Sequence, residues 1–110
     1  MYKFPLNDME VILRKDLASM SIADQAYNGA LYLTNERIVF VGYVMDIRNK
    51  YIEEILFPQI DEISRVNSLF FIPNAFLIKT THGRNPRFVV KDRDAWIADI
   101  KRKIGEFAQI

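Results

Sequence analysis

Apolar and polar positions alternate over short stretches through most of the chain, which is the pattern of half-buried β-strands. The most regular pair covers residues 30–34 and 37–41, which flank Asn35 and Glu36. Two such runs around a two-residue polar link that contains Asn predict a tight β-hairpin. A strand over 10–17 is less regular, because apolar side chains fall on both of its faces.

Four further strands follow from apolar, β-branched runs at 51–57, 60–66, 75–81 and 87–91. Pro58 ends the first of them, and Pro73 with Asn74 predicts a corner. Residues 82–85 predict a turn. Residues 19–25 are polar and predict a flexible connection.

After residue 91 the period of the apolar positions changes from 2 to 3.6, which predicts a helix. Asp92 is its expected N-cap, because a carboxylate there can accept from free backbone N–H groups. One apolar stripe follows, formed by Trp96, Ile100, Ile104 and Phe107. The fold class is therefore mainly β with one helix (α+β). We expect a barrel of about seven antiparallel strands, capped by this helix with Trp96 plugging the barrel end.

Length and composition narrow the classes of protein. With 110 residues, we expect one domain over 1–110. The absence of cysteine excludes disulfides, thiolate metal sites and a cysteine nucleophile. A net charge of +1 gives no global attraction for nucleic acid, and no apolar run is long enough to span a bilayer. We expect a cytoplasmic protein, with the inner membrane surface as a further location.

Catalysis is not expected from the ionisable residues. His82 is the single histidine and lies in a predicted turn, where a solvated side chain is the simpler interpretation. The acidic pairs Glu53-Glu54 and Asp61-Glu62 are strand neighbours whose side chains diverge, so we interpret them as charges on exposed strand edges. No cofactor-binding or metal-binding motif is present. We expect neither an enzyme, nor a cofactor, nor a metal.

The segment Gly29-Ala30-Leu31-Tyr32-Leu33-Thr34-Asn35-Glu36-Arg37-Ile38-Val39-Phe40 resembles the signature hairpin of GRAM domains, a branch of the pleckstrin-homology superfold. Downstream, Phe57-Pro58, residues 73–78, 81–83 and 88–90, and the helix start at 92–96 follow the family order. The resemblance implies a seven-stranded barrel capped by one helix. It also implies a non-catalytic module that binds membrane lipids or proteins.

Pleckstrin-homology domains that hold phosphoinositides usually carry several basic residues on the first two strands and their loop. This chain offers only Arg14 and Lys15 there, and strand neighbours point to opposite faces. We therefore do not expect a polyphosphate headgroup at the usual site.

Two other surfaces are candidates for binding. A basic set in the last quarter of the chain is a candidate anion or lipid patch: Arg84, Arg87, Lys91, Arg93 and Lys101. Its alternative is a solvated surface that offsets the helix dipole. The second candidate is an apolar corner for a partner protein, formed by Phe70, Phe71, Ile72 and Phe76. Its alternative is cover from Tyr2, Phe4 and Leu6 within the chain.

These observations predict a binding module that docks a protein partner or associates with itself. The alternative is a peripheral membrane module for anionic phospholipid, and a small enzyme is a remote third. No nucleic acid is expected, because the aromatic residues are not interleaved with the basic ones as a base-stacking surface requires.

Overall fold

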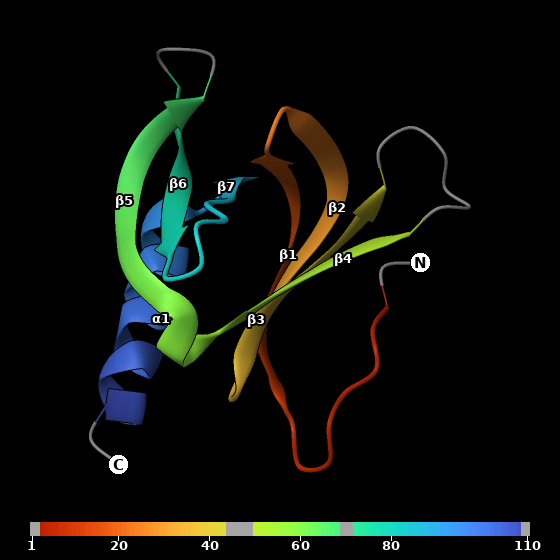
Figure 1. Ribbon diagram of the computed structural model, residues 1–110, viewed down its shortest axis with the longest axis vertical. Coiled ribbons are helices and arrows are strands. Elements are labelled where there is room, and N and C mark those ends of the chain that lie inside the picture. The colour runs from red at the N-terminus through yellow and green to blue at the C-terminus, as the bar shows by residue number, and fades with distance from the viewer. Residues whose placement is uncertain (1–2, 44–49, 69–71, 109–110) are drawn as a thin grey trace.

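The computed structural model describes residues 3–43, 50–68 and 72–108. These residues form seven strands, one short 3₁₀ helix and one α-helix (Figure 1). In chain order the elements are β1 (Ile12–Ile22), β2 (Gln25–Thr34), β3 (Arg37–Tyr43), β4 (Tyr51–Leu56), η1 (Phe57–Gln59), β5 (Ile60–Ser68), β6 (Ile72–Thr80), β7 (Arg87–Val90) and α1 (Arg93–Ala108).

The strands form one curled antiparallel sheet in the order β4-β3-β2-β1-β7-β6-β5. Strands β1 to β4 make one meander and β5 to β7 make a second. The two are joined by pairing of β1 with β7, with Ala18 opposite Val90 and Ser21 opposite Arg87. In the described residues β4 and β5 are the two edge strands, so the barrel is open between them.

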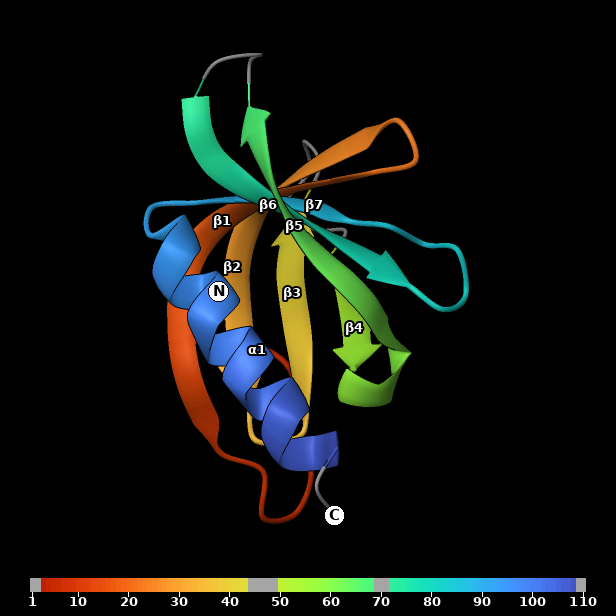
Figure 2. The ribbon, with the colours of Figure 1, turned by 90° about the vertical axis from the view of Figure 1, so that its left-hand side faces the viewer.

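The concave side of the sheet holds the main core, which α1 covers (Figure 2). Trp96 is completely buried in this core, and its indole Nε1 donates to Asp16 Oδ2 on β1 at 2.8 Å. Arg14 lies over the indole ring and donates to Asp99 on the helix at 2.7 Å. These contacts fix the helix against β1, so the predicted packing role of Trp96 is confirmed.

Most predicted elements are confirmed. The hairpin around Asn35 is β2–β3, and the four later strands are present as β4 to β7. The helix begins after Asp92, whose side chain accepts from the Ala95 N–H at 3.3 Å. Ile100 is buried, whereas Phe107 at the end of the stripe is 47% exposed and contacts Phe57.

Two predictions are wrong. Residues 19–25 belong to β1 and β2, which are joined by a tight turn at Ala23 and Asp24, with φ of 46° and 66°. Neither residue is the Gly or Asn that most often marks such left-handed positions, so this turn has no strong local signal. Pro73 and Asn74 lie inside β6 rather than at a corner, which is tolerated because Pro73 is near the start of that strand.

The N-terminal arm, residues 3–10, crosses the convex side of the sheet. Phe4 packs edge-to-face on Tyr32 with ring centroids 4.8 Å apart. It covers a second apolar cluster on β2 and β3, formed by Ala30, Tyr32, Val39 and Val41. Phe4 therefore packs on β2 and β3, whereas Phe70 and Phe71 of the apolar corner lie outside the described residues, so cover of that corner stays a prediction.

Candidate functional site

The structure divides the predicted basic patch. Arg84, on the β6–β7 loop, donates to Glu53 Oε1 at 2.8 Å and to the Tyr51 hydroxyl at 2.7 Å, both on β4. Tyr51 in turn donates to Glu53 and stacks on Tyr27. Burial and then the Glu53 hydrogen bond raise the pKa of Tyr51 to about 12. Arg84 therefore joins β4 to the second meander, and its charge is already balanced.

Arg93 is also committed to the fold. Its Nη1 donates to the Val66 carbonyl oxygen at 3.1 Å and lies 3.5 Å from that of Ala75. Its Nε is buried without a hydrogen bond and lies 3.7 Å from a carboxylate oxygen of Asp94. This side chain holds the start of α1 against β5 and β6 and does not contribute to a surface patch.

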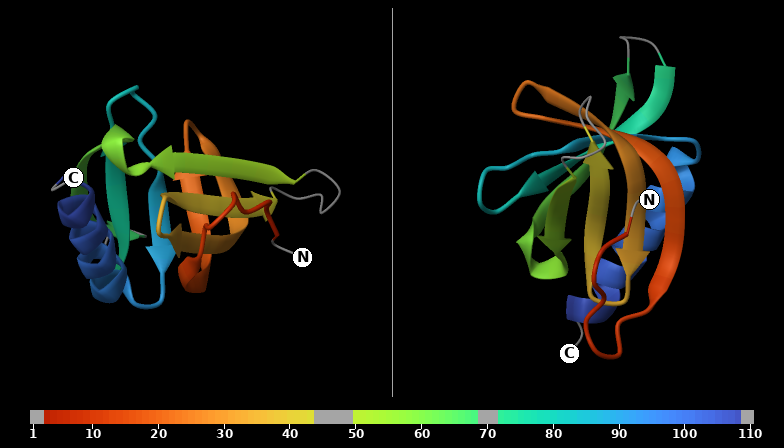
Figure 3. Two further views of the ribbon diagram at one scale, coloured as in Figure 1. Left: turned by 90° about the horizontal axis from the view of Figure 1, so that it is seen from below. Right: turned by 90° about the vertical axis from the view of Figure 1, so that its right-hand side faces the viewer.

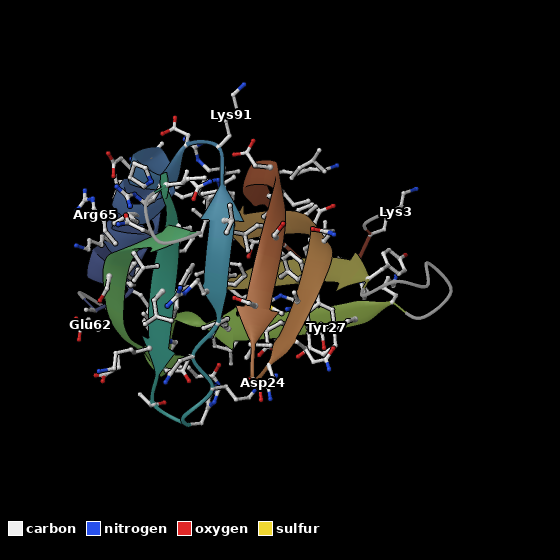
Figure 4. All side chains as sticks on the ribbon, turned by 90° about the horizontal axis from the view of Figure 1, so that it is seen from above. Lys3, Asp24, Tyr27, Glu62, Arg65 and Lys91 are labelled. Carbon is white, nitrogen blue, oxygen red and sulfur yellow. The ribbon has the colours of Figure 1, made fainter. Side chains whose placement is uncertain are left out.

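Arg87, Lys91 and Lys101 are exposed. Arg87 and Lys91 lie on the convex face of β7 and just beyond its end, because the alternate residues Phe88 and Val90 point into the core. Lys101 lies on α1. Two of the five predicted patch residues therefore share one surface, and Figure 4 shows Lys91 at the end of β7.

The predicted apolar corner does not form as a set. Phe70 and Phe71 lie outside the described residues. Phe76 is completely buried, with its ring 5.5 Å from that of Phe88, so it cannot take part in a surface. Ile72 is exposed.

The acidic pairs have different environments. Glu53 is buried and bound to Arg84, so the expectation of an exposed edge charge is wrong for this residue. Glu54 is exposed on the edge strand β4, as expected, and pairs with Arg37. Asp61 and Glu62 are exposed on the edge strand β5, as expected. His82 is exposed, with Nδ1 3.3 Å from the Thr80 hydroxyl.

A surface that the sequence did not reveal lies at the end of the molecule with the β2–β3 turn. Ten large apolar side chains are exposed among the described residues, and seven of them lie on the arm, at the start of β1, at the end of β4 or at the end of α1. They are Leu6, Met9, Val11, Ile12, Leu13, Leu56 and Phe107. We call this surface the apolar end. Seen from below, it includes the arm, the β2–β3 turn and the end of α1 (Figure 3, left).

The arm is fixed at this end by a buried ion pair. Arg37 donates through Nε and Nη2 to the two carboxylate oxygens of Glu10, at 2.8 and 2.9 Å. Nη2 also donates to the Pro5 carbonyl oxygen at 3.0 Å. The Thr34 hydroxyl donates to Glu10 as well, at 2.7 Å. These hydrogen bonds, above all those from Arg37, lower the pKa of Glu10 to about 2.

The network presents Met9 at the tip of the arm. Met9 has φ of 68°, in the left-handed region that a methionine rarely adopts, and it is 84% exposed. The Asn35 side chain accepts from the Val11 N–H at 2.8 Å and donates to the Met9 carbonyl oxygen at 3.3 Å. The fold therefore holds this apolar tip in one conformation.

Asn35 also connects the arm to the helix. On its other side it lines a hollow of about 130 Å³ together with Phe57, Phe107, Lys103 and Glu106. Asp8 and Glu36 make no ion pair within the described residues, whereas Glu106 pairs with Lys103 at 2.9 Å.

One signal for the apolar end is present in the sequence. The run Val11-Ile12-Leu13 breaks the alternation that one buried face requires, so part of it had to remain exposed. The positions of Met9, Leu56 and Phe107 beside this run depend on the tertiary fold.

No helix of the described residues is both long and apolar enough to span a bilayer. Comparison with solved structures finds the same architecture at low sequence identity. The C-terminal domain of an unknown protein from Leishmania infantum aligns with a TM-score of 0.74 and 16% identity, covering 88% of this chain and 86% of that one.

The Vps36 N-terminal PH domain aligns with a TM-score of 0.74 and 11% identity, over 96% of this chain and 87% of that one. Both likenesses concern the fold. No curated protein matches the sequence. The family model of the GRAM domain matches residues 1–103. The chain therefore belongs to the GRAM domain family, with a pleckstrin-homology-like fold.

Proposed function

We propose that this chain is a non-catalytic docking module that binds a protein partner through the apolar end. The observation that carries the proposal is the concentration of exposed apolar side chains there, seven of the ten in the described residues. Exposed apolar groups gathered at one end of a molecule typically mark an interaction surface. The Glu10–Arg37 ion pair holds the backbone of the arm that carries Leu6 and Met9, which reduces the conformational entropy that the arm loses on binding.

The charge of this end favours a protein over an anionic membrane. Asp8 and Glu36 stand beside the apolar residues without a cation partner in the described part of the chain, and anionic headgroups would repel them. A second copy of the chain would bring the same acids together. The surface therefore suits a partner with an apolar patch edged by Lys or Arg.

The test is quantitative capture from the source cells with chains substituted at exposed positions. Met9→Asn removes the most exposed apolar side chain and suits the left-handed backbone, so the fold is preserved. Val11→Thr is a second variant. Ile52→Thr on β4 is the matched control, because Ile52 is exposed outside the apolar end. We expect Met9→Asn to weaken the partner's affinity about tenfold or more and the control to leave it unchanged.

A second experiment tests membrane binding. It measures co-sedimentation with vesicles of phosphatidylcholine alone and with vesicles that also contain phosphatidylserine. Partner binding that is equal in wild type, both variants and the control contradicts docking at the apolar end. Binding to the anionic vesicles alone, reversed by salt, would favour the membrane function instead.

A further inference from the structure

Two shallow hollows lie end to end along the seam between β1 and β7, on the convex face of the sheet. The first, of about 400 Å³, is lined by Leu17, Ser19, Asn28, Val89 and Lys91 among others. The second, of about 360 Å³, is lined by Ser21, Asp24, Leu77, Asn85 and Arg87 among others. Because Ser19 pairs with Val89 and Ser21 with Arg87, the hollows follow one another along the seam, and we call the two together the seam groove.

Side-chain size explains the groove. The convex positions of β1 within it are Ser19 and Ser21, whose side chains are short. Longer side chains border them: Leu17 is 74% exposed at one end, and Leu77 lies along the β6 side. Strand alternation places the core residues of β1 on the opposite face, so the groove does not disturb the core.

Arg87 and Lys91 supply the charge of the groove. They are four residues apart on one face, which corresponds to about 13 Å along a strand. Neither makes an ion pair in the part of the chain that the structure describes. Asp24 lines the far end, beyond Arg87, and is the acidic residue of the groove lining. Figure 4 shows Lys91 and Asp24 at opposite ends of the neighbouring strands β7 and β1.

We propose that the seam groove binds an extended acidic peptide, with two carboxylates four residues apart meeting Arg87 and Lys91 and an apolar side chain midway between them contacting Leu17 and Val89. The spacing of the cations matches the repeat of an extended chain. The concave, serine-lined floor also suits a narrow chain better than a flat membrane.

Side chains, rather than strand addition, would provide this recognition, because β1 already pairs on both sides, with β2 and β7. Exposed ion pairs contribute modestly and are screened by salt. The proposal rests on the groove and its two free cations, and is independent of docking at the apolar end.

The probe is a labelled heptapeptide with glutamate at its second and sixth positions and Ser-Val-Ser at positions three to five, so that the valine shares a face with both glutamates. The matched control peptide carries lysine at the same two positions. Backbone amide resonances of the complete chain are followed during titration. We expect shifts centred on Ser19, Ser21 and Val89 with the glutamate peptide, and none with the lysine peptide.

Substitutions then test the charges. Arg87→Gln and Lys91→Gln should each weaken binding about two- to fivefold, and Lys101→Gln, which removes the same charge on α1, should not. Asp24→Asn, which suits the left-handed backbone there, should tighten it. Three results would overturn the proposal: equal binding of both peptides, no shift along the seam at millimolar peptide, or seam shifts produced only by phosphatidylserine vesicles.

Discussion

Glu10 is a carboxylate with no exposed side-chain surface, held by Arg37 and Thr34. Its folded pKa of about 2 lies below the ordinary value, so the fold stabilises its ionised form. Stability from this group is therefore complete above about pH 4.5 and is lost as the pH falls toward 2. The sequence did not reveal this pair, because its members are far apart along the chain.

We expect Glu10→Gln to lower the free energy of unfolding at pH 7 by about 3 kcal/mol, since it removes the buried carboxylate that pairs with the Arg37 guanidinium. The wild type should lose about 2 kcal/mol between pH 7 and pH 3 from this group, and the variant should lack that part of the slope. Urea denaturation of both proteins at pH 7 and pH 3 measures these free energies of unfolding. The conservative control is Glu36→Gln, at a more exposed carboxylate, and a parallel loss in that control would contradict the assignment.

Tyr51 contributes stability that is lost at high pH rather than at low pH. Its pKa is raised to about 12, so the fold favours the neutral phenol, and this stability is present below about pH 10 and lost between pH 10 and 12. Absorbance of tyrosinate during an alkaline titration should show a late-titrating residue that Tyr51→Phe removes. Glu53→Gln should lower this pKa, because the hydrogen bond to an ionised carboxylate stabilises the phenol. An unchanged late step in Tyr51→Phe would show that it belongs to another tyrosine.

Secondary-structure elements were predictable where their signals are local. The β2–β3 hairpin and α1 follow from alternation, a two-residue link and an N-cap. The β1–β2 turn was missed because Ala23 and Asp24 adopt positive φ without the usual residues. The predicted basic patch does not form as one set, for a related reason. A sequence shows that Arg84 and Arg93 are cations, but not that Glu53 and backbone carbonyl oxygens already bind them.

Substitutions in the β1–β2 turn should therefore be able to stabilise the fold. Replacing Ala23-Asp24 with Asn-Gly suits both left-handed positions, and we expect the free energy of unfolding to rise by about 1 kcal/mol. Thermal and urea denaturation measure the gain. Pro86→Gly, which gives the loop between β6 and β7 the same Asn-Gly sequence, is a comparison that should destabilise, because Pro86 is buried and glycine adds conformational freedom to the unfolded chain. Equal effects at both sites would contradict a conformational cause.

The molecule as a whole keeps its two candidate surfaces apart: the apolar end lies at the β2–β3 turn, and the seam groove lies on the convex face of β1 and β7. The barrel and helix were predictable as a class, but neither surface was, because each is assembled from segments distant in sequence. Since acidic groups border the apolar end, we expect a monomer by light scattering across a dilution series. A concentration-dependent dimer that Met9→Asn abolishes would instead assign that end to self-association.

The β1–β7 seam also has a consequence for how the chain folds. Each meander forms from neighbouring segments, but the seam pairs residues near opposite ends of the chain, as in Ala18 and Val90. Closing so long a loop is entropically costly, so joining the two meanders is expected to set the folding rate. The seam groove comes into existence only at that late step. A peptide bound there would slow unfolding by holding together the last contacts to form.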